Sequence, residues 1–271
     1  MPWTPGRRRA QRALESPYED VPDHLVQPLW DWIEGGFSTY SGYDLERIRD
    51  IALDLRMPLR GAGYEQLRAF REQCSNDAEF MLDLVEAMLE RFGFDNRRGI
   101  ELGALLFAAN SAYAVKDSWD GLEHRVSPGV KELVQEVTDA ASGSAGDHLI
   151  AAWNEAYGRN PDAVKSYSES IKAVEAALAH HVSPQNAKQT LGTMIRDVAA
   201  KPSKWEFEVA DGSVSNVETV LNMMRMLWDG QTSRHGGVNP TRPETIAEAR
   251  AAVHLGSALV QFGVSRAFRP K

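Results

Sequence analysis

The sequence predicts a mainly α-helical protein, in which a helical N-terminal domain with one short β-hairpin precedes an all-α helical bundle. Apolar residues recur three and four positions apart through most of the chain, which is the period of an amphipathic helix. Glycine and proline separate these runs at regular intervals. With 271 residues, of which 43% are hydrophobic, the chain can bury the core of one large or two ordinary domains.

Composition excludes several classes of function. No run of about 18 apolar residues occurs, and the N-terminus leads into charged residues, so we expect neither export nor a membrane span. The single cysteine, Cys74, permits no intrachain disulfide and no cysteine-based metal site, which favours a cytoplasmic location. A formal net charge of −8 argues against a non-specific nucleic-acid coat, so any contact with RNA must be local.

Residues 1–20 are expected to form a basic, mobile arm. Arg7, Arg8, Arg9 and Arg12 cluster there, and Pro17 and Pro22 prevent a continuous helix. Such an arm is either a solvated tail or a phosphate-binding segment that lies on a partner.

Residues 21–142 are expected to form the helical N-terminal domain, with a sensor or partner-binding role. Residues 64–74 and 77–91 predict a helical hairpin, with residues 75–77 as the cap between them. Aromatic and β-branched residues around Asp120-Gly121 predict a short β-hairpin that pairs 112–115 with 122–126. No catalytic pattern is present in this part.

The small-residue loop 141–146 is the predicted domain boundary, and residues 147–268 form the predicted second domain. Asp147 is the predicted cap of a helix that ends at Gly158, and Pro161 opens a longer one. Pro184 and Pro243 are each expected to begin a helix, with a polar crossing at 205–212 between them. We expect the helix over 161–182 to pack antiparallel to the final helix, which is almost entirely apolar.

The polar corner 228–237, between two apolar helices, is the predicted functional site. It brings together Arg234, whose planar charge binds phosphate oxygens, and His235, which titrates near neutrality. Glycines at 230, 236 and 237 are expected to let the backbone turn tightly. The alternative interpretation is that Arg234 is a surface cation and His235 a helix cap.

Glu175 is the predicted partner of this corner. It borders the apolar stripe of the 161–182 helix, where a carboxylate needs a cation or a hydrogen bond, so structural pairing is the alternative role. Gln231, Ser233 and Gly236 are the predicted substrate-binding residues. A metal site formed by His180, His181 and His235 is disfavoured because adjacent helical side chains diverge by about 100°. We therefore expect no metal and no cofactor.

Four segments together resemble the C-terminal domain of abortive-infection proteins, which belongs to the HEPN superfamily of helical, mostly RNA-directed proteins. The resemblance covers residues 147–264, and its segments occur in the order found in the family. The segments lie at 148–162, 167–176, 183–192 and 231–237.

The resemblance implies an antiviral protein that acts on RNA, such as tRNA or another structured RNA, as a homodimer formed through the C-terminal helices. It implies that His235 is a general acid or base, that Arg234 holds phosphate and that Glu175 orients His235 in metal-independent RNA cleavage. In family members that cleave RNA, a spacer separates Arg from His, whereas Arg234 and His235 are adjacent. Arg250 and His254 are also too close for that pattern and lie on a helix that is expected to be buried.

Two functions therefore stay open. One is a toxin-like endoribonuclease. The other is a non-catalytic RNA-binding or interaction module, in which the N-terminal half responds to a phage or host protein.

Overall fold

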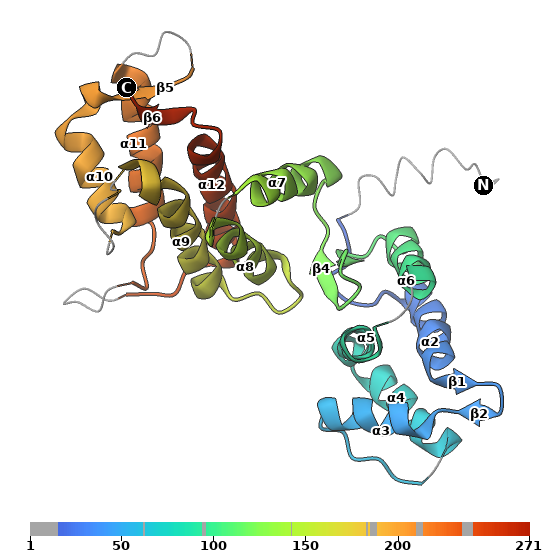
Figure 1. Ribbon diagram of the computed structural model, residues 1–271. Coiled ribbons are helices and arrows are strands. Elements are labelled where there is room, and N and C mark those ends of the chain that lie inside the picture. The colour runs from blue at the N-terminus through green and yellow to red at the C-terminus, as the bar shows by residue number, and fades with distance from the viewer. Residues whose placement is uncertain are drawn as a thin grey trace, which may run out of the picture. The chain divides into compact units, whose positions relative to one another are not determined.

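The structure is a computed structural model that describes residues 16–61, 63–93, 96–141, 143–182, 184, 189–209, 214–234 and 241–271. It divides into two compact units, residues 1–125 and 126–271. The predicted mainly α fold class is confirmed, since both units consist mostly of helices with a few short antiparallel strand pairs (Figure 1). Within the described residues, no helix combines the length and the apolarity needed to cross a membrane.

Unit 1 is a small helical bundle that carries two short strand pairs. Its elements are α2 (Asp23–Phe37), β1 (Ser38–Thr39), β2 (Gly42–Tyr43), α3 (Leu45–Asp54), α4 (Tyr64–Asn76), α5 (Ala78–Phe92), α6 (Asn96–Ala108), β3 (Tyr113–Val115) and β4 (Leu122–His124). Its core is formed by apolar side chains at the predicted helical spacing, with the rings of Phe37 and Phe70 stacked 5.9 Å apart at its centre.

The sequence predicts the local structure of unit 1 well. The helical hairpin is confirmed as α4 and α5, and the Asp77 side chain caps α5 by accepting from the backbone N–H groups of Glu79 and Phe80. The β-hairpin is confirmed as β3 and β4, which pair antiparallel with Tyr113 opposite His124.

The end of the predicted mobile arm is attached to unit 1. The backbone of Tyr18 donates to Asn110 and accepts from Ala112, at 2.9 and 2.7 Å, and forms a parallel bridge to Ser111. The arm is therefore fixed from this residue onward. Its basic cluster lies outside the described residues.

Unit 2 is a larger helical bundle with one strand pair. Its elements are α7 (Pro128–Ala140), α8 (Ala145–Tyr157), α9 (Ala163–Val182), α10 (Leu191–Ala200), the 3-10 turn η1 (Pro202–Lys204), β5 (Trp205–Phe207), α11 (Val214–Asp229), α12 (Ile246–Val264) and β6 (Phe268–Pro270).

The division between the units falls before α7, not at the predicted loop 141–146. Val134 and Val137 of α7 are buried in the core of unit 2. Ala145 is also fully buried, and a Cβ on Gly146 would lie 2.8 Å from the carbonyl oxygen of Thr138. The small residues at 145–146 therefore allow α8 to begin against α7, and they belong to a packed corner.

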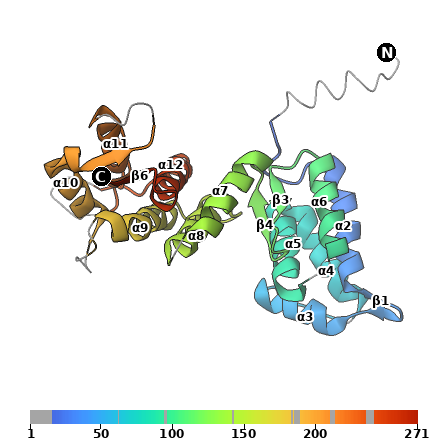
Figure 2. The same cartoon turned by 45° about the horizontal axis from the view of Figure 1, so that its top comes forward.

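The final helix α12 runs parallel to α9 and antiparallel to α8, so the predicted antiparallel packing of α9 against α12 is wrong. Gly256 faces Ser170 and Gly263 faces Leu178, so residue numbers rise in the same direction along both helices. Along α8 the order is reversed against α9, with His148 bonded to Glu169 and the Ala152 carbonyl bonded to Ser166. Figures 1 and 2 show α8, α9 and α12 together in unit 2.

The predicted all-α second domain contains one antiparallel strand pair, which is a correction. β5 lies in the predicted polar crossing and pairs with β6, with Phe207 opposite Phe268. Trp205 and Phe268 stack with their ring centroids 5.2 Å apart. The packing of these aromatic rings therefore holds the C-terminal strand β6 against β5.

Three helices in unit 2 begin later or earlier than the sequence predicts. α10 begins at Leu191 behind a capping box formed by Thr190 and Thr193, not at Pro184. α12 begins at Ile246 behind a capping box formed by Thr245 and Glu248, not at Pro243. Proline marks where a helix can start, whereas the hydroxyl and its reciprocal partner decide where it does start. α8 begins at Ala145, so Asp147 lies in its first turn and is not its cap.

We predict that Gly256→Val destabilises unit 2 by about 1–3 kcal/mol, because a Cβ there already lies 3.4 Å from Ser170 and the added methyl groups would force α9 and α12 apart. Thermal unfolding followed by circular dichroism measures the effect. Ala251→Val, at an exposed position of the same helix, is the control. Helix propensity alone favours Val over Gly and Ala over Val, so a melting temperature of Gly256→Val at or above that of the control would contradict the close packing.

Candidate functional site

Arg234 lies in the predicted corner, but it is engaged with unit 2 itself. Its guanidinium carbon lies 3.3 Å from the centroid of the Trp228 ring, a cation–π contact. Burial lowers the pKa of Arg234, while the negative charges of Asp229 and Glu175 act in the opposite direction. One of its η nitrogens is buried. Arg234 is thus half-buried in a setting where acidic groups balance its charge.

Glu175 is close enough to Arg234 for their charges to interact, as the sequence suggested, but it also has a structural bond. Its carboxylate accepts from the backbone N–H of Leu191 at 2.6 Å, and Leu191 is the first residue of α10. Burial raises the pKa of Glu175, and the Leu191 bond and the charge of Arg234 lower it. Glu175 therefore links α9 to the start of α10 and to the corner.

Glu244 organises the corner and was missed by the sequence interpretation. It is only 5% exposed, and its carboxylate accepts from the backbone N–H and the hydroxyl of Ser233, both at 2.8 Å, and from Thr232 at 3.3 Å. Burial raises the pKa of Glu244, but the bonds from Ser233 outweigh burial and hold it below the ordinary value. The only sequence signal was an acidic residue after proline and before an apolar helix.

The remaining predicted residues of the corner divide into two groups. Gln231 and Ser233 are half-buried, and the Ser233 hydroxyl already donates to Glu244. His235 and Gly236, together with Gly237, lie outside the described residues. Gly230 is required for close approach, since a Cβ there would collide with the Tyr167 hydroxyl, and its backbone does not adopt a positive φ. The described part of the corner is therefore a packed joint between α11 and α12.

A second cluster, on α8 and α12, also contains a histidine and an arginine, here exposed and half-exposed beside two buried aromatic residues. Nε2 of His254 lies 2.7 Å from the Tyr157 hydroxyl oxygen, and the Arg250 guanidinium lies 5.0 Å from the Tyr157 ring centroid. Trp153 stacks on Tyr157 at 4.3 Å and meets the His254 ring edge-on at 6.1 Å. We call these four residues the Tyr157–His254 cluster.

The expectation that Arg250 and His254 lie buried is wrong. His254 is exposed and Arg250 is half-exposed, because a spacing of four residues puts both on the face of α12 that borders α8. Arg250 donates through Nε to the Ala156 carbonyl at 3.2 Å, and no described residue forms an ion pair with it. This fixes the guanidinium in place while its charge is unneutralised within the described residues.

The surroundings of His254 in the Tyr157–His254 cluster favour its neutral form. Burial of the ring side that faces Trp153 and Tyr157 lowers the pKa of His254 below 6.5. Burial also raises the pKa of Tyr157, partly offset by the charge of Arg250. At neutral pH the cluster therefore combines an uncharged imidazole, a protonated phenol and a permanent cation.

Among the described residues, no group of three or more histidine, cysteine or carboxylate side chains is placed to hold a metal ion. His180 and His181 lie side by side near the end of α9, and the third residue of the disfavoured metal site, His235, lies outside the described part.

We predict that Arg234→Ala lowers the thermal stability of the protein, because it leaves the Trp228 face uncovered and Glu175 without the cation that balances its charge. The expected loss is about 1–2 kcal/mol, in the range of a desolvated cation–π contact. Arg266→Ala, near the end of the same unit and exposed, is the control. An unchanged melting temperature for Arg234→Ala would show that this arginine is not a structural joint.

We predict that Glu244→Gln reduces the loss of unfolding free energy that occurs as the pH falls below about 4.5. The folded-state pKa of Glu244 is lowered, so its contribution is complete above the unfolded value near 4.5 and is lost as pH falls through the folded value. Urea unfolding at pH 7 and at a series of pH values below 4.5 measures this. Equal pH dependence of the wild type and Glu244→Gln over that range would contradict the assignment.

The chain was compared with family models, curated proteins and solved structures, and none of them matches.

Proposed function

We propose that unit 2 carries a metal-independent RNA-cleaving site at the Tyr157–His254 cluster, in a protein of the abortive-infection type. The observation that supports this most is the bond between His254 and Tyr157 at 2.7 Å on an exposed face, with the Arg250 guanidinium held beside the same ring. Arg234, in contrast, is half-buried against Trp228. The Tyr157–His254 cluster thus offers the acid–base group and the phosphate-binding cation that the sequence analysis assigned to the corner.

The chemistry follows from the residue types. Neutral His254 takes the proton of a ribose 2′-hydroxyl, and the oxygen attacks the adjacent phosphorus. The bond to the 5′-oxygen breaks, leaving a 2′,3′-cyclic phosphate and a 5′-hydroxyl whose proton comes from solvent. Arg250 stabilises the negative charge that builds on the phosphate oxygens. Tyr157 positions the His254 ring through their shared hydrogen bond.

The substrate proposed for this site is an unpaired stretch of RNA, such as a loop of tRNA or of another structured RNA. The exposed His254 ring and the half-exposed Arg250 are accessible to splayed-out nucleotides. A paired strand is held in a regular helix, in which the 2′-oxygen is not in line with the bond that breaks. A homodimer through the C-terminal helices, a cytoplasmic location and a phage or host trigger acting through unit 1 belong to the same proposal. Burial of α12 alone does not require the dimer, because α7, α8, α9 and α11 cover it within unit 2.

The second candidate is a non-catalytic RNA-binding or interaction module. The observation that favours it is the engaged state of the corner, where Arg234 stacks on Trp228 and Ser233 is bonded to Glu244. In that case the Tyr157–His254 cluster binds phosphate without cleaving RNA.

We predict that His254→Gln and Arg250→Gln each slow RNA cleavage by about 10²- to 10⁴-fold, the range for loss of a general base or of an electrostatic donor. The assay incubates purified full-length protein with unpaired RNA in the presence of EDTA and resolves the products by gel electrophoresis. The wild-type rate should fall as pH drops below the pKa of His254, which lies below 6.5.

His148→Gln is the matched control, since His148 lies on α8, is half-exposed and is bonded to a side chain, Glu169 at 2.6 Å. Its activity should equal that of the wild type. If His254→Gln cleaves as fast as the control while His235→Ala is inactive, the chemistry belongs to the corner. If the wild type binds RNA and never cleaves it, the non-catalytic module is the correct function.

A further inference from the structure

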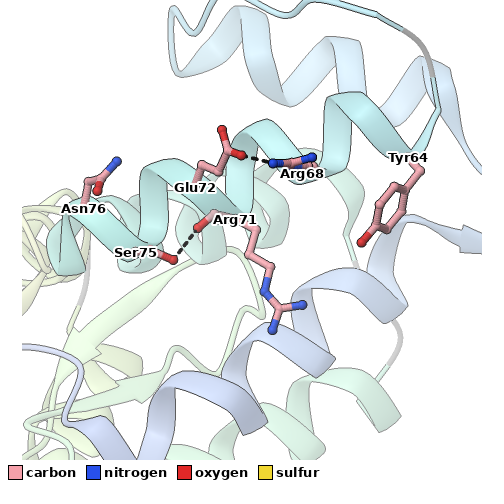
Figure 3. A pocket seen from close by; sticks show the side chains of 6 residues that line it. All are labelled: Tyr64, Arg68, Arg71, Glu72, Ser75 and Asn76. Carbon is pink, nitrogen blue, oxygen red and sulfur yellow. Dashed lines mark hydrogen bonds and ion pairs between the residues drawn. The ribbon is translucent and has the colours of Figure 1, made fainter.

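Unit 1 has a polar pocket along the exposed side of α4, and none of its lining residues belongs to the sites described above. Figure 3 shows its lining, which consists of Tyr64, Arg68, Arg71, Glu72, Ser75 and Asn76. The pocket encloses about 500 Å³, which lies in the usual range for small-ligand sites. A second hollow, lined in part by Arg60, shares Arg68 and Glu72 with it. Three arginines therefore line two hollows that share Arg68.

The pocket follows from the spacing of its residues on one helix. Tyr64, Arg68, Arg71 and Ser75 lie four, three and four positions apart, so they form one stripe along α4. Along the helix axis, Arg68 lies about 6 Å and Arg71 about 10 Å from Tyr64. Tyr64 and Arg71 extend from the same side of the helix in Figure 3. An aromatic ring and two cations thus follow one another over the length of about one nucleotide.

The side chains of this stripe are held in place before any ligand arrives. Arg71 lies 5.4 Å from the centroid of the buried Trp30 ring and donates to Gln27 at 2.9 Å. Fixing a long side chain in advance reduces the entropy that binding would cost.

Tyr64 and Arg68 are also positioned by neighbouring side chains. The Tyr64 ring lies 6.4 Å from that of Tyr43 and is still 62% exposed. Arg68 donates to Glu72 at 2.9 Å, which leaves a carboxylate beside the cations as an acceptor for hydroxyl groups.

We propose that this pocket binds a nucleotide, with the base stacked on Tyr64, the phosphate between Arg68 and Arg71, and a ribose hydroxyl donating to Glu72. Exposed aromatic faces accept any base, and arginine forks bind phosphate oxygens. The nucleotide is either free or part of single-stranded RNA. The pocket lies in unit 1, and the experiment that tests it measures binding. Its result therefore does not depend on whether the Tyr157–His254 cluster cleaves RNA.

The experiment titrates full-length protein with three probes, namely UMP, a fluorescein-labelled unpaired ten-nucleotide RNA and the same RNA in a duplex. Calorimetry reports the first and fluorescence anisotropy the other two. His254→Gln is the background throughout, so that cleavage does not remove the RNA. We expect the unpaired RNA to bind more tightly than the duplex, because a paired base cannot stack on Tyr64.

Tyr64→Leu and Arg68→Gln should each weaken binding by about tenfold, the effect expected for one lost stacking or phosphate contact. Arg68→Gln should also reduce the salt dependence of RNA binding by about one phosphate contact. Arg97→Gln is the matched control, because Arg97 forms the same exposed pair through Nε, with Glu101 four residues on at 3.1 Å. Its affinity should equal that of the His254→Gln protein without further change.

The probes also separate the two sources of the ligand. Binding of UMP as tight as that of the RNA identifies a free-nucleotide site, whereas much tighter binding of the RNA identifies a strand-binding surface. Either result supports the pocket if Tyr64→Leu and Arg68→Gln weaken it and Arg97→Gln does not. The proposal is overturned if neither UMP nor the unpaired RNA binds at millimolar concentration, if the two pocket variants bind as the control does, or if duplex and unpaired RNA bind equally.

Discussion

The close contact between α9 and α12 is the constraint on which unit 2 depends. Glycine and serine at this crossing, Gly256 against Ser170 and Gly263 against Leu178, allow the two helix backbones to approach. Ser166 and Ser170 are fully buried and donate to backbone carbonyls, so the small polar residues leave no unsatisfied hydroxyl there. Because α8 packs antiparallel to both helices, its Tyr157 meets His254 of α12. The geometry of the Tyr157–His254 cluster is therefore a consequence of small residues elsewhere on the helices.

Buried charge explains why the corner differs from the Tyr157–His254 cluster. A guanidinium or a carboxylate removed from water must be paired or hydrogen-bonded, and both ends of the corner meet that requirement internally. Glu244 accepts a hydrogen bond from the backbone of Ser233, and Glu175 accepts one from the backbone of Leu191. The Arg234 guanidinium stacks on the Trp228 ring. Groups used in this way join α9, α10, α11 and α12. Arg250 carries its charge at a half-exposed position, and among the described residues its hydrogen-bond partner is a neutral carbonyl, so its charge can serve a ligand.

The sequence predicts much of the fold because local signals carry it. Helical periodicity, the Asp77 cap and the alternation that predicts the β3–β4 hairpin each act over a few residues, and the structure confirms them. The direction of α12 against α9 depends on which of several apolar helices lies next to it, and no local pattern encodes that choice. The domain boundary was misplaced because small residues serve flexible loops and tight helix contacts equally, as at Gly146.

The residues of the two candidate sites were harder to predict for a related reason. The neighbours of Arg234 in the sequence predict a functional role for it, but the exposure of its side chain depends on packing against α9 and α11. The sequence disfavours Arg250 and His254 because they are too close for the spacing of the resembled family and their helix is apolar overall, although four-residue spacing keeps both on one edge of it. Glu244 had no distinguishing pattern, since its partners at 232 and 233 are separated from it by a loop.

The central claim is that His254 is the acid–base group of an RNA site, and nuclear magnetic resonance of the histidine rings tests it most directly. Wild-type protein would be titrated with RNA that carries a 2′-deoxy linkage and cannot be cleaved, while the ring resonances of His254 and His148 are followed. The account predicts a saturable shift of the His254 resonances, absent in Arg250→Gln, with those of His148 unchanged. Saturable RNA binding that leaves the His254 resonances unmoved would contradict it.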